Sequence, residues 1–370
     1  TASPSVTTTY IIRVLNDTCR GADTVTVFVN PIPAALAGNS RNLCINDSTT
    51  IGGAEVIGNT YSWSSNPAGF SSSISNPTVK PSVTTTYIVT ETITATGCFK
   101  IDSMTVTVLP LPIVSAGTDK TICIGSPVAI GGSPTGPAGS TYVWSPGAGL
   151  SNATIANPNA SPVATSTYIV KVTDSNTCVN RDTVVVNVNP LPIVSAGGDL
   201  QLCINDTISI GGVPTGPLNS TYSWSPASSL VNATVSNPLA LPTITTNYIV
   251  TVTDTNGCVN KDTMTVNVNV LPVVNAGANR SICFTDSTLL GGSPIAVNSS
   301  FSWTPLSGLG SATMPMPFAS PAITTDYILT VTDNLTTCVN SDTVRVEVLP
   351  LPGAITGPAV PICIGDSIQI

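Results

Sequence analysis

The feature that most constrains this chain is a sequence unit that recurs in tandem, four times complete and without insertions. Each complete unit carries one Trp and, at a constant spacing after it, one Tyr: Trp63 and Tyr87, Trp144 and Tyr168, Trp224 and Tyr248, Trp303 and Tyr327. The ten cysteines repeat with the same period, because a short and a long interval alternate from Cys19 to Cys363. A period of this kind is typical of repeat architectures, so the function has to be sought in a repeated module.

Proline-containing joints divide the chain into small domains. They predict four complete repeats at 31–109, 110–189, 190–269 and 270–349, each long enough to fold as one small domain. Residues 1–30 are expected to be the C-terminal part of a preceding repeat, and residues 350–370 the N-terminal part of a following one. Both ends are therefore expected to continue in a longer protein.

The third repeat shows the expected local structure. Alternation of β-branched and polar residues predicts six short strands, at 193–196, 207–210, 221–224, 234–235, 248–253 and 263–268. Gly, Pro, Asn and Asp clusters separate them, and no segment has helical periodicity. This pattern predicts an all-β fold, a linear array of antiparallel β-sandwich domains.

The aromatic pair makes that prediction more specific. Trp224 lies on the strand that follows Ile210, the expected end of the second strand of the domain, and Tyr248 opens the longest alternating strand. Immunoglobulin-like sandwiches place a buried Trp and a hydrogen-bonded corner Tyr at these two positions. We therefore expect the four Trp residues, and the four Tyr residues at the constant spacing after them, in the core. The alternative is a platform on which a sugar ring stacks.

The amino-acid composition limits the kinds of partner that the chain can bind. Only 8% of residues are charged, none is His, and the net charge is −8, which makes nucleic acid an unsuitable partner. Thr, Ser and Asn interrupt every apolar stretch before the roughly 18 residues of a membrane span. Such a surface is typical of an extracellular β-rich protein. A surface covered by glycan or by neighbouring filament subunits is the alternative.

Several phrases of the repeat resemble a known group of proteins. SAGGDLQLCINDTISIGG, TYSWSP, SNP and YIVTVTDTNGCVNKDTMTV, with their counterparts along the whole chain, are similar to polycystic-kidney-disease-like (PKD-like) and other immunoglobulin-like repeats. These occur in very long surface proteins of Bacteroidota, including gliding adhesins and proteins with gliding-motility-associated tails. The resemblance implies export through the type IX system and display outside the outer membrane.

The cysteines predict disulfides. Ten cysteines without His or a Cys-x-x-Cys motif argue against zinc and for an oxidising compartment. In the third repeat Cys203 precedes its nearest predicted strand, whereas Cys258 follows the end of the Tyr248 strand. The two are displaced in opposite directions, which separates them by roughly 40 Å against a limit of about 7 Å for bridged Cα atoms.

We therefore expect each bridge to join one repeat to the next. In a head-to-tail array, the turn before the second strand and the last hairpin turn of the following repeat face each other. The predicted pairs are Cys44 with Cys178, Cys123 with Cys258, and Cys203 with Cys338. Cys19, Cys98, Cys283 and Cys363 would pair outside this stretch. In-domain pairs such as Cys123 with Cys178, and free or interchain thiols, remain alternatives.

An Asp followed by Ser or Thr recurs at two places in the repeat. It resembles the O-glycosylation signal of Bacteroidota periplasmic and surface proteins. The candidate acceptors are Thr24, Ser48, Ser103, Thr183, Thr207, Thr263, Ser287, Thr343 and Ser367. The alternative is that Asp closes a turn before a strand by accepting backbone hydrogen bonds.

Metal, cofactor and catalytic sites are not expected. Pairs such as Asp174 and Asp182 flank the last hairpin turn, but we expect solvated turn carboxylates rather than a calcium site. Without His there is no Ser–His arrangement, and Glu55, Glu91 and Glu347 are expected to be isolated from partners.

Three functions of different classes fit these observations. The first is a structural extracellular filament or stalk segment, a stiff rod of disulfide-linked repeats whose partners are neighbouring repeats, lateral copies or glycans. The second is a cell-surface adhesin whose repeats or tip bind carbohydrate or another surface. The third is an exported enzyme whose catalytic domain lies outside residues 1–370. We favour the first.

Overall fold

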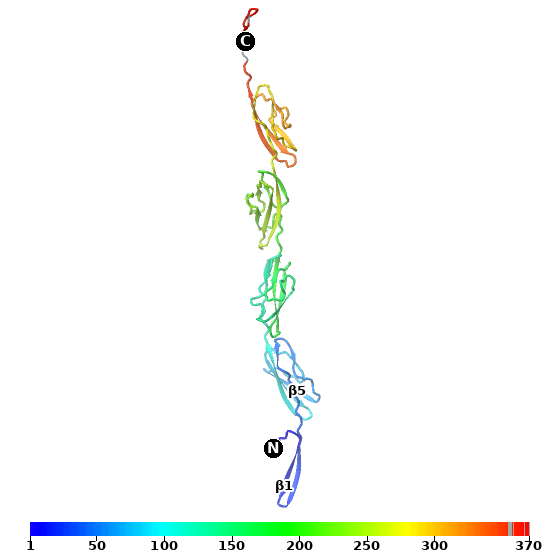
Figure 1. Ribbon diagram of the computed structural model, residues 1–370. Helices are drawn as coiled ribbons and strands as arrows, with labels where there is room; N and C mark the ends of the chain where they lie inside the picture. Colours follow the sequence, from blue (N-terminus) through cyan, green and yellow to red (C-terminus); the bar gives the residue numbers. More distant parts are fainter. Residues whose placement is uncertain (354–356, 358, 366, 370) are drawn as a thin grey trace. The chain divides into compact units, whose positions relative to one another are not determined.

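The computed structural model describes residues 1–353, 357, 359–365 and 367–369, and these contain only β-strands and loops (Figure 1). The all-β prediction is confirmed. The chain divides into two compact units, Thr1–Asn189 and Pro190–Ile370. Each unit contains two repeats of the same sandwich-like plan.

The second repeat illustrates the plan. Its larger sheet has the order β11-β13-β14-β9, in which the first three strands are antiparallel and β9 runs parallel to β14. A small sheet pairs β10 with β12. The strands are β9 (Lys120–Cys123), β10 (Val128–Ala129), β11 (Thr141–Ser145), β12 (Asn159–Ala160), β13 (Ser166–Thr173) and β14 (Val179–Asn189).

The other repeats have the same order of strands. The first contains β3 (Arg41–Cys44), β4 (Thr49–Thr50), β5 (Asn59–Asn66), β6 (Thr78–Val79), β7 (Thr85–Ile93) and β8 (Phe99–Leu109). The third contains β15 (Leu200–Cys203), β16 (Ile208–Ser209), β17 (Thr221–Ser225), β18 (Leu239–Ala240), β19 (Thr246–Thr253) and β20 (Val259–Asn269). The fourth contains β21 (Arg280–Cys283), β22 (Thr288–Leu289), β23 (Ser299–Thr304), β24 (Phe318–Ala319), β25 (Thr325–Asp333) and β26 (Val339–Leu349).

The core of each repeat follows from the period of two along its longest hairpin. In β13, Tyr168, Val170 and Val172 are buried, because alternate side chains point to the same face of a strand. Trp144 on β11 packs with them, and its indole nitrogen donates to the carbonyl of Ile155 at 3.0 Å. The four Trp residues are all buried, and so are the four Tyr residues that were expected in the core, Tyr87, Tyr168, Tyr248 and Tyr327, so they are not stacking platforms.

The Tyr hydroxyls bond back to the chain at a corner. Tyr168 donates to the carbonyl of Ala148 at 3.0 Å, and Tyr327 donates to the carbonyl of Ser307 at 2.6 Å. The Tyr248 hydroxyl lies 2.6 Å from that of Ser229. Burial raises the pKa of Tyr87, Tyr168 and Tyr327, because the apolar core disfavours the phenolate.

Two strand predictions in the third repeat are wrong. Residues 193–196 form no strand, because their backbone groups bond elsewhere: Ser195 N–H donates to the Thr215 carbonyl, and Ala196 N–H to Asp262. The ladder forms further along the chain, at β15. Residues 234–235 are also not a strand, and the short pairing strand is β18 instead.

Residues before the first repeat form a two-stranded hairpin, β1 (Thr8–Asn16) with β2 (Cys19–Val27). It corresponds to the β13–β14 hairpin of a full repeat. Its apolar side chains Ile12, Val14 and Val25 are 57%, 63% and 49% exposed, whereas their counterparts in full repeats are buried. No helix among the described residues is long and apolar enough to cross a membrane.

Candidate functional site

The end of the parallel strand in each repeat presents a cysteine. In the first repeat Cys44 closes β3, where it pairs with Leu109 of β8, and the next residue, Ile45, donates its N–H to the Leu109 carbonyl at 2.8 Å. Asn46 then takes a positive φ of 73°, and Asp47 N–H donates to the Cys44 carbonyl at 3.0 Å. This turn fixes the cysteine at the edge of the sheet.

The last hairpin turn of each repeat presents the second cysteine. In the second repeat Asp174 follows the end of β13, and its Oδ1 accepts from the N–H groups of Asn176 and Cys178, at 2.9 and 2.8 Å. Asx turns of this kind are favoured by the short carboxylate side chain. Cys178 is held in one position and is fully buried.

A disulfide joins these two elements across the boundary of two repeats. Cys44 is bonded to Cys178, with a Cα–Cα distance of 5.6 Å and a sequence separation of 134 residues. In the second unit Cys203 is bonded to Cys338 with the same Cα–Cα distance and a separation of 135 residues. Both bonds therefore connect a repeat to its successor, at equivalent places.

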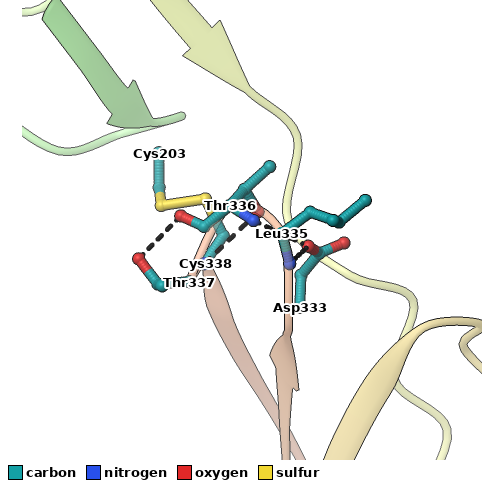
Figure 2. Close-up of a disulfide and its surroundings, with 6 residues drawn as sticks. All are labelled: Cys203, Asp333, Leu335, Thr336, Thr337 and Cys338. Atoms are coloured by element: carbon teal, nitrogen blue, oxygen red, sulfur yellow. Dashed lines mark hydrogen bonds between the residues drawn. A yellow bond between two sulfur atoms is a disulfide. The ribbon is translucent and has the colours of Figure 1, made fainter.

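The second of these bridges is drawn in Figure 2. Asp333 Oδ1 accepts from the N–H groups of Leu335 and Thr336 at 2.8 and 2.9 Å, and so shapes the turn that carries Cys338. These backbone donors lower the pKa of Asp333, because they stabilise its carboxylate form. The third predicted pair, Cys123 with Cys258, would link the two units and stays a prediction.

Disulfides persist in oxidising compartments, so the chain is a secreted or extracellular protein. Four described cysteines belong to no disulfide: Cys19, Cys98, Cys283 and Cys363.

A side-chain hydrogen bond ties the last hairpin to the proline joint that enters the same repeat. Asn180, two positions after Cys178, donates from Nδ2 to the carbonyl of Pro112 at 2.9 Å. Asn260 with Pro192 and Asn340 with Pro272 make the same bond at the same distance. This asparagine was not predicted from the sequence, although its constant place after the cysteine in three repeats was a usable signal. The first repeat has Lys100 there.

The repeated aspartates at the start of the last strand also hold the joint. In the second repeat Asp182 Oδ2 accepts from the N–H of Ala116, a buried residue, at 2.8 Å. Asp102, Asp262 and Asp342 make the same bond with Ala37, Ala196 and Ala276, also at 2.8 Å. These carboxylates thus have a structural role, in which each bonds a distant segment rather than the turn before its own strand.

The predicted acceptor hydroxyls are all at the surface. Thr24, Ser48, Ser103, Thr183, Thr207, Thr263, Ser287, Thr343 and Ser367 are exposed, which leaves each of them open to modification. Asp366, which precedes Ser367, lies outside the described residues. No group of three or more Cys, Asp or Glu residues in the described part of the chain is arranged to hold a metal ion.

The expectation that Glu91 is isolated was wrong. Its side chain is 3% exposed and accepts three hydrogen bonds, from Ala35 N–H at 2.8 Å, Asn59 Nδ2 at 2.6 Å and the Tyr61 hydroxyl at 3.2 Å. The strand register puts Glu91 where other repeats have a core valine. Burial, and to a smaller extent the adjacent Glu91 carboxylate, raises the pKa of Tyr61. Glu347 also has a partner, Ser281, at 3.0 Å.

Comparisons with known proteins find distant structural likenesses and no family. No family model matches the chain, and no curated protein matches it. Solved structures with a similar arrangement include the N-terminal eight immunoglobulin domains of Down Syndrome Cell Adhesion Molecule. That match has 13% identity and a TM-score of 0.36, and it covers 94% of this chain and 53% of the other. This chain thus spans about half the length of that fragment.

Two further structures are similar at the same distant level. An I-band fragment of titin has 9% identity and a TM-score of 0.33, over 63% of this chain and 97% of its own. The insect immune protein hemolin has 14% identity and a TM-score of 0.25, over 85% of this chain and all of its own. The chain itself is a series of disulfide-linked immunoglobulin-like domains, as its own sheets and bridges show.

Proposed function

We propose that this chain is a segment of a structural extracellular filament or stalk, a stiff rod on the bacterial surface made of the repeats 31–109, 110–189, 190–269 and 270–349. One observation carries the proposal. The bridges Cys44–Cys178 and Cys203–Cys338 each join the edge of one sandwich to the last hairpin turn of the next. They occur at equivalent places in two separate units, as expected for a repeated mechanical joint.

The position of the bridge explains why it suits a rod. A disulfide within one sandwich would stabilise that domain but leave its linker free to bend, because interfaces between domains of one chain are small. A bridge across the joint instead adds a second covalent connection beside the linker. The Asn180–Pro112 bond and the prolines of the joint restrain the same segment further.

The setting of the rod is also a proposal. The resemblance of the repeats to those of Bacteroidota surface proteins supports display outside the outer membrane. Partners would be neighbouring repeats and lateral copies of the chain. Glycans on the exposed Ser and Thr residues that follow Asp would protect a weakly charged surface. A hexose mass on Thr183 or Thr263 of the native protein would support this last point, and unmodified peptides would contradict it.

Small-angle X-ray scattering of the full chain tests the stiffness. Replacing Cys44 and Cys178 together by Ser should lower the radius of gyration and the largest dimension, because the joint of the first unit then bends freely. The Cys98→Ser variant, which removes an unbonded thiol in the first repeat, is the matched control and should scatter like the unchanged chain. Identical scattering from the bridged and unbridged proteins would contradict the proposal.

One hollow favours the adhesin as a second candidate. It has a volume of about 290 Å³ in the first repeat and is lined by residues that include Phe70, Lys80, Ser82 and Tyr87. The Phe70 and Tyr87 rings meet edge to face with centroids 5.2 Å apart. A partly exposed aromatic ring beside hydroxyl and amine groups suits a sugar. Glycan-array binding that is lost in Phe70→Ala would support it, and no binding by the unchanged chain would contradict it.

A further inference from the structure

The tyrosine corner of the first repeat differs from those of the other three repeats. In the second repeat the hydroxyl of Tyr168 donates to the carbonyl of Ala148. The matching carbonyl in the first repeat belongs to Pro67, and it accepts from the Ser65 hydroxyl at 2.7 Å instead. In the described part of the chain, the hydroxyl of Tyr87 therefore makes no such bond to the backbone.

Tyr87 lines an open hollow in the first repeat. It is 3% exposed, and its hydroxyl lies beside that of Thr85, a second buried residue that lines the hollow. Ser65 Oγ also accepts from the N–H of Phe70 at 3.1 Å, which helps to hold the Phe70 ring edge to face with that of Tyr87. The hollow thus combines a positioned aromatic ring with hydroxyls that are fixed by the core.

A cation stands at the same hollow. Among the described residues that line it, only Lys80 is charged, and Lys80 is exposed. No ion pair within the described part of the chain includes Lys80. In a chain with 11 basic and 19 acidic residues, an unpaired cation beside a hollow favours an anionic ligand.

These features occur together only in the first of the four complete repeats. Counted from the core Trp, the places of Ser65, Phe70 and Lys80 are filled by other kinds of residue in the later repeats. They hold Pro146, Ser151 and Ser161 in the second, Pro226, Val231 and Leu241 in the third, and Pro305, Gly310 and Ser320 in the fourth. A purely mechanical repeat gives no reason for three linked changes around one hollow, whereas ligand binding does.

The hollow is open although the neighbouring repeat is in place. Its lining lies within residues 65–87 of a complete repeat, and the second repeat is bonded to the first through Cys44 and Cys178. Its volume of about 290 Å³ is close to the lower limit of small-molecule sites, which is about 300 Å³. The hollow therefore has room for a small ligand such as a short sugar.

We infer that this hollow binds an acidic sugar, a pyranose that carries a carboxylate. Phe70 packs against an apolar face of the sugar ring, Lys80 pairs with the carboxylate, and the hydroxyls of Tyr87 and Ser82 bond those of the sugar. The inference rests on the second candidate function, the adhesin, to which it adds the class of sugar. The stiffness of the rod does not depend on it.

Two matched pairs of sugars test the inference. Methyl glucuronide and methyl glucoside differ only in a carboxylate in place of a hydroxymethyl group, and so do methyl galacturonide and methyl galactoside. Their affinities for the full, natively oxidised chain are measured by saturation-transfer NMR. In at least one pair the acid should bind about tenfold more tightly, because it adds a charge-assisted contact. At about 1 M salt the difference should shrink, since the exposed ammonium group of Lys80 is then screened.

Variants assign the binding to the hollow. Lys80→Gln should lower the affinity for the acid about tenfold, to that of the neutral sugar, and leave the neutral sugar unchanged. Lys261→Gln, at an exposed lysine of the third repeat, is the matched control and should change neither. Tyr87→Phe should weaken both sugars severalfold. Its unfolding midpoint should fall less than that of Tyr168→Phe, which also loses a corner bond.

The other outcomes overturn the inference. Equal binding of acid and neutral sugars that is lost in Phe70→Leu would leave the adhesin candidate standing without an acidic ligand. No binding of any of the four sugars would remove the sugar site itself. Binding of the acid that Lys80→Gln leaves unchanged would place the site elsewhere. Equally tight binding of a tetraglutamate peptide would show that charge alone attracts the ligand.

Discussion

Four aspartates each hold a backbone amide of the segment that enters their repeat. The bond between Asp182 and Ala116 represents all four: a carboxylate at the start of the last strand satisfies a buried N–H 66 residues away. Removing the acceptor would leave that N–H without a partner in the core, which costs free energy. A single side chain thereby fixes where the joint meets the sandwich.

This role predicts that Asp182→Ala lowers the stability of the second repeat. The variant should lose about 1–3 kcal/mol of unfolding free energy in the second repeat, because a buried donor is left unsatisfied. Denaturant unfolding followed by Trp fluorescence measures it. Asp119→Ala is the matched control: Asp119 accepts from the exposed N–H of Val185 at 2.8 Å, which water can replace. Equal stabilities for the two variants would contradict this role.

The first repeat has a buried, hydrogen-bonded carboxylate, Glu91, at a core position where the other repeats have Val. Replacing it by Val, as found at the matching position of the other repeats, should destabilise the first repeat by about 2–3 kcal/mol, because three donors lose their acceptor. Glu91→Gln keeps an acceptor and should cost less. Unfolding curves of the two variants check the order. A Val variant that is more stable than the unchanged chain would show that the hydrogen bonds do not matter.

The corner tyrosines predict a loss of stability at alkaline pH. The pKa of Tyr327 is raised in the folded repeat, so the folded state keeps its proton where the unfolded state begins to lose it. Its contribution is fully present below the unfolded pKa of about 10 and declines as the pH rises above that value. Unfolding curves between neutral pH and the alkaline range measure the decline, which should be shallower in Tyr327→Phe. An unchanged slope in that variant would contradict the assignment.

The long hairpins could be predicted from the sequence because the alternation of apolar and polar residues that defines each strand lies within the strand itself. Alternation along 248–253 and 263–268 indicates which side chains face the core, and the strands predicted there are confirmed, as parts of the longer β19 and β20. The segment 193–196 alternates as well, but a distant carboxylate and a loop carbonyl take up its backbone bonds. Whether an extended segment becomes a strand of a sheet depends on which groups bond its backbone. Those groups lie far away in the sequence, so the local pattern does not reveal them.

At the joints between repeats, too, some features could be predicted from the sequence and others could not. That cysteines of successive repeats face each other follows from the direction of the strands, and so could be reasoned from spacing. The bond from Asn180 to Pro112 spans 68 residues and needed the structure. So did the burial of Glu91, because the polar residue stands at a position that its neighbours fill with Val.

The hairpin-to-joint bond predicts how one element restrains another. Asn180→Ala should increase amide hydrogen exchange over residues 113–117, because the joint loses one of its two ties to the last hairpin. The loss in unfolding free energy should be only about 1 kcal/mol. The matching segment of the third repeat, which Asn260 still holds, is the internal control. Unchanged exchange in the variant would show that the bond is not needed.

The mechanical properties of the whole molecule depend on which domains the disulfides connect. A chain of separate sandwiches with internal disulfides would have the same folds and cores but freely bending joints. A chain bridged from each repeat to the next resists bending at every bridged boundary. The proposed stiffness depends on the second arrangement.

Peptide mapping of the natively oxidised protein, without reduction, therefore tests the central claim most directly. After digestion by trypsin and a protease that cleaves before Asp, we predict NLCIN (42–46) joined to DSNTCVNR (174–181), and DLQLCIN (199–205) joined to DNLTTCVNS (333–341). A peptide in which Cys178 is joined instead to Cys123, within one repeat, would contradict it.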